Sequence, residues 1–175
     1  MAGTAHERPL VVVMGVSGTG KTTIGEALAA RLHLDYRDAD VFHPQANIDK
    51  MAAGHPLDDD DRAPWLAAIG GWLAEHDLTG GVVSCSALHR TYRDTLRSLA
   101  PRARFLHLSG DPEVIAERMR ARPEHFFKVE MLASQLETLE PLEDDEPGVT
   151  ADLSDPVEQI IDHFLSTLAP TGGTP

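Results

Sequence analysis

Residues 15 to 22, with the sequence GVSGTGKT, form the segment with the clearest chemistry in this chain. They match the phosphate-binding loop pattern G-x-x-x-x-G-K-[ST] in full. Glycines let such a loop wrap tightly and aim its backbone N–H groups at an anion. The lysine reaches the β- and γ-phosphates of a nucleotide, and the hydroxyl after it holds Mg²⁺. We therefore predict an ATP site made by Gly15, Val16, Ser17, Gly18, Thr19, Gly20, Lys21, Thr22 and Thr23.

Two aspartates, Asp38 and Asp40, supply the acidic groups that phosphoryl transfer requires. One carboxylate is needed near Mg²⁺ and another near the acceptor hydroxyl. Alternation along an extended segment would point both side chains the same way. We expect Asp38 to hold Mg²⁺ through water, and Asp40 to orient or deprotonate the hydroxyl. Taken alone, the pair also fits an aspartate-rich turn at the end of a strand.

Other motifs narrow the class of nucleotide-binding protein. The sequence lacks the N-K-x-D motif with which GTPase switches read the base. Motor ATPases place a metal-binding aspartate at the end of a later strand, but the nearest candidate, Asp111, follows a glycine and precedes a proline, which is typical of a helix cap. A short chain with one phosphate-binding loop and an Asp-x-Asp pair favours a small-molecule kinase. A nucleotide-dependent binding switch without catalysis is the alternative.

Length and composition fit one domain spanning residues 1–175. The formal net charge is −13, and no apolar run is long enough to cross a bilayer, so neither a nucleic-acid nor a membrane partner is expected. Cys85 is the only cysteine, which rules out an intrachain disulfide and fits a reducing cytoplasm. The first residues, MAGTAHERP, show no secretory signal pattern, and residues 171–175 are expected to form a flexible tail.

Apolar runs and helical periodicity alternate along the chain and predict the elements that carry these residues. Strands are expected at residues 9–14, 34–38, 82–86, 103–108 and 149–153. Helices are expected to start near Thr22, Trp65, Leu88, Asp111-Pro112, Val129 and Asp155-Pro156. This alternation predicts an α/β fold with a five-stranded parallel sheet and helices on both faces. Ligands of such sheets bind at the carboxyl ends of the strands, where the loop and the two aspartates lie.

Four further segments resemble the gluconate kinase family. They are DADVFHPQANIDKM (38–51), PLDDDDRAPWL (56–66), SCSALHRTYRDTLR (84–97) and HFFKVEMLASQLETLEP (125–141). The resemblance implies ATP-dependent phosphorylation of D-gluconate at its 6-hydroxyl. It also implies a three-layer P-loop fold like that of nucleoside monophosphate kinases, with a small mobile helical lid, and a homodimer. Shikimate kinase is the alternative, but the glycine triplet typical of that family is replaced here by SCSAL, residues 84–88.

Five residues on these segments are expected at the acceptor substrate. Arg62 is expected to bind the carboxylate of gluconate, because a guanidinium makes two parallel N–H bonds to a carboxylate; a surface ion pair is the alternative. His43 is expected to bond a sugar hydroxyl, although it also fits a turn with the proline after it. Lys50 is equally compatible with a substrate contact and with solvent. Ser86 and Arg93 follow the third predicted strand and are expected nearby.

The lid is expected at about residues 117–128. Arg118 and Arg122 are four residues apart, so they share a helix face. We expect Arg118 to bind ATP and Arg122 to stabilise the transferring phosphoryl group; which of the two stacks on adenine stays open.

The run of four aspartates, residues 58–61, is expected to serve mainly as a helix cap and a solvated turn. Asp61 or Asp60 is predicted to be the N-cap of the helix that carries Arg62, and Asp58 to lie in solvent. Four acidic residues in succession lack the alternate spacing of a calcium loop.

Overall fold

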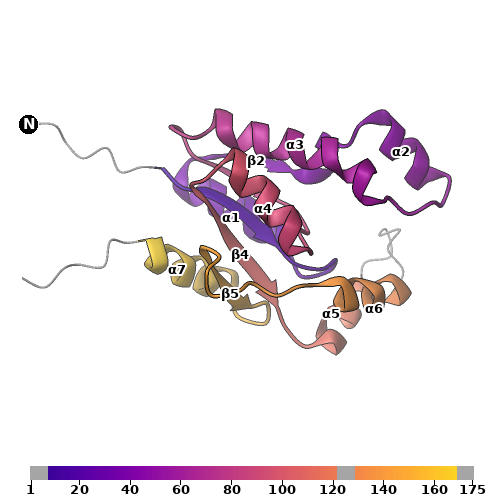
Figure 1. Cartoon of the computed structure of the whole chain (residues 1–175). Coiled ribbons are helices and arrows are strands. Elements are labelled where there is room, and N and C mark those ends of the chain that lie inside the picture. Colours follow the sequence, from indigo (N-terminus) through magenta and orange to yellow (C-terminus); the bar gives the residue numbers. More distant parts are fainter. Residues whose placement is uncertain (1–7, 122–128, 169–175) are drawn as a thin grey trace, which may run out of the picture.

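A parallel sheet of five strands forms the centre of the fold (Figure 1). The computed structural model describes residues 8–121 and 129–168. Its strands are β1 (Leu10–Met14), β2 (Asp35–Asp38), β3 (Gly81–Ser84), β4 (Ala103–Ser109) and β5 (Gly148–Asp152). They lie in the order β2-β3-β1-β4-β5, and all neighbouring strands are parallel. The predicted sheet is confirmed, with each strand shifted by at most two residues at either end.

Helices connect the strands within the described residues. They are α1 (Lys21–Leu32), the short 3-10 helix η1 (Ala39–Phe42), α2 (Gln45–Ala52), α3 (Asp59–Glu75), α4 (Arg90–Leu99), α5 (Pro112–Arg120), α6 (Val129–Thr138) and α7 (Val157–Leu168). The helix α2 was not predicted from the sequence. Its apolar residues Ile48 and Met51 stay exposed and only Asn47 is buried, so α2 lacks the apolar stripe that marks a surface helix.

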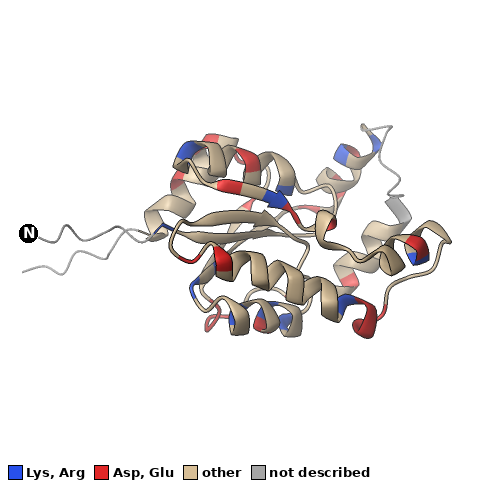
Figure 2. Ribbon diagram, turned by 90° about the horizontal axis from the view of Figure 1, so that it is seen from above, with Lys and Arg blue, Asp and Glu red and all other residues tan. Residues whose placement is uncertain are grey.

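Both faces of the sheet are covered because β1 is apolar on both sides. Leu10, Val12 and Met14 pack with α3 and α4, whereas Val11 and Val13 pack with α1 and α7. Figure 2 shows the strands between two rows of helices. A third apolar cluster joins the phosphate-binding loop to α5 and α6. The loop therefore rests on packed helices next to the most buried strand.

The run of four aspartates starts α3, and the predicted cap was wrong. Asp58, rather than Asp61 or Asp60, is the N-cap: its side chain accepts the Asp61 N–H at 2.8 Å, and the Asp61 side chain accepts the Asp58 N–H at 2.9 Å. This reciprocal capping box makes Asp59 the first helical residue, so Asp58 is more than a solvated turn residue. The acidic first turn, the red stretch at the end of α3 nearest α2 in Figure 2, also favours the positive end of the helix dipole.

Candidate active site

The phosphate-binding loop leads from β1 into α1 at the carboxyl edge of the sheet. Gly18 and Gly20 have φ angles of 82° and 93°, in a region that glycine enters without strain. A Cβ atom on Gly18 would lie 2.7 Å from Cγ of Met119 in α5, so a larger residue would also clash there. The backbone N–H groups of this loop and the start of α1 together form a site suited to an anion.

Lys21, the first residue of α1, reaches back over the loop. Its Nζ donates to the carbonyl oxygen of Val16 at 3.0 Å, and the Thr19 hydroxyl donates to the same oxygen at 2.8 Å. Burial lowers the pKa of Lys21, and the negative charges of Asp38 and Asp40 act in the opposite direction. The ammonium group is therefore within electrostatic reach of both aspartates. Thr22 and Thr23 lie exposed in the same first turn of α1.

Asp38 and Asp40 lie at the end of β2, but not on one extended segment. Asp38 caps η1, and its Oδ1 accepts the N–H of Asp40 at 2.9 Å. Strand alternation therefore does not relate the two side chains, and that part of the prediction was wrong. Partial desolvation, with the charge of Asp38, raises the pKa of Asp40, while His43 and Lys21 oppose the rise. A carboxylate with a raised pKa is a better proton acceptor.

His43 is held by an aromatic ring and a buried asparagine. Its ring stacks on Trp65, with centroids 4.6 Å apart and planes 6° apart. The side-chain nitrogen of Asn47 lies 3.3 Å from Nδ1 of His43 and donates to the carbonyl oxygen of Asp61 at 2.9 Å. Trp65 Nε1 donates to the carbonyl oxygen of Ala39 at 2.8 Å. Sequence reasoning missed these roles of Asn47 and Trp65, although both lie in segments that resemble the gluconate kinase family.

Arg62 projects from α3 against Tyr92 of α4. Its Nη1 donates to the Tyr92 hydroxyl at 3.2 Å, and its Cζ lies 5.7 Å from the centre of the ring. The Tyr92 hydroxyl donates to Oδ1 of Asp59 at 2.7 Å, and Arg62 itself lies 3.9 Å from that oxygen. Burial lowers the pKa of His43, Asp40 opposes this, and Arg62 adds to it. Arg62, His43 and Asp40 therefore share one side of the site.

Lys50 and Ser86 occupy different parts of this region. Lys50 Nζ lies 2.5 Å from Oδ2 of Asp61 and 3.8 Å from Oδ2 of Asp58, and the hydrogen bond to Asp61 is the main cause that raises its pKa. Lys50 thus contacts both carboxylates of the α3 capping box and stabilises it. Ser86 is half-buried just after β3, and its carbonyl oxygen accepts the Gly15 N–H at 3.4 Å. Ser86 therefore lies next to the first glycine of the phosphate-binding loop.

Arg93 is buried, so its predicted contact with substrate was wrong. The side chains of Arg93 and Glu146 are both 0% exposed. Nε and Nη2 of Arg93 donate to the Glu146 carboxylate at 2.6 and 3.0 Å, and Nη1 donates to the carbonyl oxygen of Ala87 at 2.9 Å. Arg93 is three residues before the buried Leu96, on the face of α4 that packs into the core. Its guanidinium joins α4 to the segment before β5.

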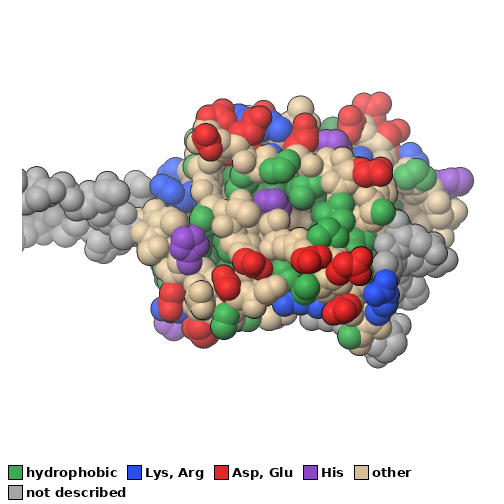
Figure 3. All heavy atoms as spheres, turned by 90° about the horizontal axis from the view of Figure 1, so that it is seen from below, with side chains coloured by type: hydrophobic (Ala, Val, Ile, Leu, Met, Phe, Trp, Pro, Cys, Tyr) green, Lys and Arg blue, Asp and Glu red, His purple; other side chains and the backbone are tan. Residues whose placement is uncertain are grey.

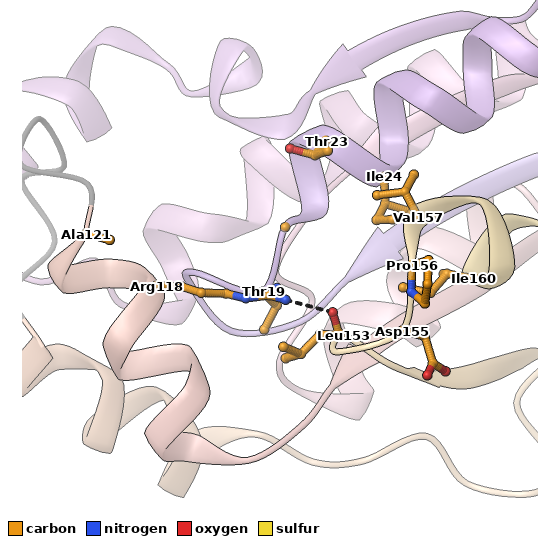
Figure 4. A pocket seen from close by; sticks show the side chains of 11 residues that line it. Thr19, Thr23, Ile24, Arg118, Ala121, Leu153, Asp155, Pro156, Val157 and Ile160 are labelled. Atoms are coloured by element: carbon orange, nitrogen blue, oxygen red, sulfur yellow. Dashed lines mark hydrogen bonds between the residues drawn. The ribbon is translucent and has the colours of Figure 1, made fainter.

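A cavity of about 540 Å³ opens beside the loop, between α5 and the start of α7 (Figure 4). Arg118 crosses one side of it, and its Nη2 donates to the carbonyl oxygen of Leu153 at 3.0 Å. Four residues predicted to bind ATP meet here. The lining residues are Thr19, Gly20, Thr23, Ile24, Arg118, Ala121, Leu153, Asp155, Pro156, Val157 and Ile160. Arg122 and the rest of the predicted lid, residues 122–128, lie outside the described residues.

The surface carries many acidic side chains, with Lys and Arg scattered among them on the face shown in Figure 3. Between residues 8 and 121 and between 129 and 168, no helix is long and apolar enough to cross a membrane. The same described residues contain no cluster of three His, Cys, Asp or Glu side chains that could hold a metal ion. A cation at the loop would therefore need further ligands from bound phosphates or water.

Comparison with known proteins identifies close relatives. Residues 17–169 match the family model described as shikimate kinase. The chain is 43% identical over 164 residues to the thermoresistant gluconokinase of Escherichia coli (strain K12), covering 92% of this chain and 94% of that protein. It is 45% identical over 154 residues to a gluconokinase of Gluconobacter oxydans (strain 621H), covering 83% and 86%. The crystal structure of a gluconokinase from Sinorhizobium meliloti 1021 shares 46% identity and superposes with a TM-score of 0.81 over 91% of each chain.

Proposed function

Because the chain belongs to the gluconokinase family, within the wider shikimate kinase group of P-loop proteins, we propose that it transfers the terminal phosphoryl group of ATP to D-gluconate. The observation that carries the proposal is that Lys21 and Asp40 lie near enough for their charges to interact. Lys21 belongs to the phosphate-binding loop, Asp40 belongs to the acceptor side with His43 and Arg62, and the two charges interact. The products are ADP and 6-phospho-D-gluconate.

The nucleotide is assigned to the loop and to the adjoining cavity. Its phosphates accept the loop N–H groups, and Lys21, whose ammonium group has three donors, donates to phosphate oxygens while it keeps its bond to the Val16 carbonyl oxygen. The purine ring is assigned to the cavity lined by Ile24, Leu153 and Val157, where apolar side chains favour a flat ring. Arg118 supports this assignment because a guanidinium plane stacks on aromatic rings.

Thr22 and Asp38 are the residues that would hold Mg²⁺. Both offer oxygen ligands, which Mg²⁺ prefers, and a kinase ion needs only one or two protein ligands because phosphates and water supply the others. The Thr22 hydroxyl in the exposed first turn of α1 fits this requirement. When bound, the ion neutralises charge on the phosphates.

Gluconate is assigned to the side of Arg62, His43 and Asp40. Arg62 binds its carboxylate and His43 bonds one of its hydroxyl groups. The 6-hydroxyl oxygen attacks the γ-phosphorus, its proton passes to Asp40, and the bond from the γ-phosphorus to the bridging oxygen of ADP breaks. The raised pKa of Asp40 makes it a better acceptor for that proton. Lys21 stabilises the charge on the transferring group.

Three other proposed contacts extend this site. Ser86, next to Gly15, is proposed to contact substrate between the loop and the acceptor side. Lys50 is proposed to contact the acceptor when it leaves the capping box of α3. Arg122 is proposed to stabilise the charge of the transferring phosphoryl group, a role it would share with Lys21.

We also propose that the protein is a homodimer in the cytoplasm. The resemblance to gluconate kinases supports the dimer, and the single, buried Cys85 supports a reducing compartment. Light scattering on the purified protein measures the assembly directly: a dimer has twice the chain mass of 19.0 kDa.

An acceptor screen tests the proposed reaction. ADP release is coupled to a recorded signal, with D-gluconate, other sugar acids and shikimate as acceptors, and NMR identifies the phosphorylated oxygen. We expect turnover with gluconate and none with shikimate. Asp40→Asn is expected to abolish turnover while ADP affinity persists. Turnover with shikimate alone would refute the assigned substrate, and near-normal kcat in Asp40→Asn would refute the assigned base.

A further inference from the structure

One backbone N–H of the phosphate-binding loop is paired with a side chain from far along the sequence. The N–H of Ser17 donates to Oε1 of Gln135 at 2.7 Å, and the contact is partly buried. Gln135 lies in α6, which the sequence analysis assigned no role at the site. One N–H group of the phosphate-binding loop therefore bonds a side chain of the protein instead of pointing at a phosphate.

The position of Gln135 on α6 shows that it faces the loop. Leu132, Leu136 and Leu139 belong to the apolar cluster that also contains Val16 of the loop. Gln135 is three residues after Leu132 in α6 and four before Leu139, which directly follows the helix, so it lies on the same side as these leucines. A polar residue in an apolar stripe costs stability unless its polar atoms are bonded, and here the Ser17 N–H supplies the bond.

The Ser17 N–H and the Val16 carbonyl belong to one peptide unit. That unit is planar and trans, so its N–H and its C=O point in opposite directions. Gln135 holds the N–H end at 2.7 Å, and the C=O end accepts Lys21 Nζ at 3.0 Å and the Thr19 hydroxyl at 2.8 Å. A rotation of this one peptide plane would break all three bonds together.

We propose that Gln135 is a positioning residue for Lys21. Through the Val16–Ser17 peptide it fixes the carbonyl oxygen that holds the Lys21 ammonium in the loop. Without Gln135, the peptide plane can rotate and Lys21 loses its hydrogen bond to the Val16 carbonyl oxygen. Ordering the loop then costs free energy when the nucleotide binds, which weakens binding. The inference rests on the proposed function only in that the loop binds ATP.

A double-mutant cycle with MgADP as the probe tests this coupling. Calorimetric titration compares the wild type, Gln135→Met, Lys21→Ala and the double variant. Gln135→Met is expected to weaken MgADP binding about five- to tenfold, the worth of one net hydrogen bond. In the Lys21→Ala background the same substitution is expected to change affinity less than about twofold, because its effect passes through Lys21. Gln159→Met, the same change at an exposed residue of α7, is the control and should leave affinity unchanged.

Steady-state kinetics and stability complete the test. For Gln135→Met, KM for ATP should rise while KM for gluconate stays near the wild-type value. The Tm should fall by roughly a few degrees only, since methionine fits the apolar stripe and one part-buried N–H loses its partner. If Gln135→Met does not fold, Gln135→Leu takes its place, because it also removes the side-chain oxygen that accepts the Ser17 N–H. Equal losses of MgADP affinity in both backgrounds, or a lower Tm with unchanged affinity, would overturn the proposal. The calorimetric titration contains no gluconate, so such a result would not bear on the proposed substrate. The acceptor screen tests the substrate separately.

Discussion

Removing the charge of Glu146 tests whether Arg93 is a structural residue. Glu146→Gln keeps the shape of the side chain but leaves the Arg93 guanidinium with no negative partner in a place where both side chains are 0% exposed. Burial alone raises the pKa of Glu146, but the hydrogen bonds from Arg93 and from the Glu143 N–H outweigh it and lower the pKa. The native carboxyl group is therefore ionised, and the guanidinium depends on its charge.

The expected loss follows from breaking a buried ion pair on one side. Such a change costs about 3–5 kcal/mol, and the lower end applies because the new amide oxygen still accepts a hydrogen bond. In a chain of this size, a loss of about 3 kcal/mol lowers Tm by roughly 6–12 °C. Replacing both partners with methionine should recover most of the stability, since no charge is then left unpaired.

Urea and thermal unfolding followed by circular dichroism measure this loss. Asp94→Asn is the matched control, because Asp94 pairs with Arg90 at 3.0 Å but is half-exposed, and exposed pairs contribute roughly 0.5 kcal/mol or less. KM for gluconate should not change in Glu146→Gln. A loss of less than about 1 kcal/mol together with a higher KM for gluconate would show that Arg93 serves the substrate, as the sequence analysis expected, and would refute the structural assignment.

Three other predictions follow from the site and the core. Lys21→Ala should abolish turnover and weaken ADP binding in calorimetry, because Lys21 acts on the phosphates. Arg62→Lys should lower kcat/KM for gluconate by roughly 10- to 100-fold, the worth of a charge-assisted hydrogen bond of about 1.5–3 kcal/mol, and leave KM for ATP unchanged. The control Asp58→Asn should do little, since asparagine caps a helix equally well. Equal losses in both variants would contradict the assignment of Arg62 to the carboxylate of gluconate. Burial, aided by the charge of Arg93, lowers the pKa of His107 to about 4 from its ordinary 6.5. Below pH 6.5 the imidazole is protonated in the unfolded chain but still neutral in the folded chain, so about 3 kcal/mol of stability should disappear between pH 6.5 and 4. His107→Leu should make the free energy of unfolding less dependent on pH in this range. An unchanged pH dependence would show that His107 is not the cause of the loss.

The elements that local physics determines were predictable. A continuous apolar run such as Leu10–Met14 must be buried on both faces, which requires helices on both sides of the sheet. Asp111 was predicted to be a helix cap, and its side chain accepts the Glu113 N–H at 2.8 Å at the start of α5. The loop pattern placed Lys21 at the start of α1 because its glycines and the helix N-terminus are adjacent in the chain.

The failures of prediction concern contacts between segments distant in the chain. The sequence around Arg93 does not show that Glu146, 53 residues later, comes to lie against it. The partner of Ser17 is likewise 118 residues away. At Asp58 the missing information was smaller: the same four aspartates permit several caps, and the reciprocal bonds with Asp61 select one of them.

The central place of β1 in the strand order divides the chain into two contiguous functional parts. Everything assigned to gluconate lies within residues 40–86, in the segments that follow β2 and β3 on one side of β1. The walls of the nucleotide cavity beyond the loop and α1 come from the other side, after residue 117. With the proposed site, a gene segment running from β2 through α4 would carry acceptor specificity as a unit that recombination could exchange between related kinases. Arg93 sets one condition on such an exchange, because a donor segment that brings this arginine also needs the acidic partner that Glu146 provides. Compatible crossovers should keep that pair together, and lineages that changed acceptor in this way should have replaced both residues or neither.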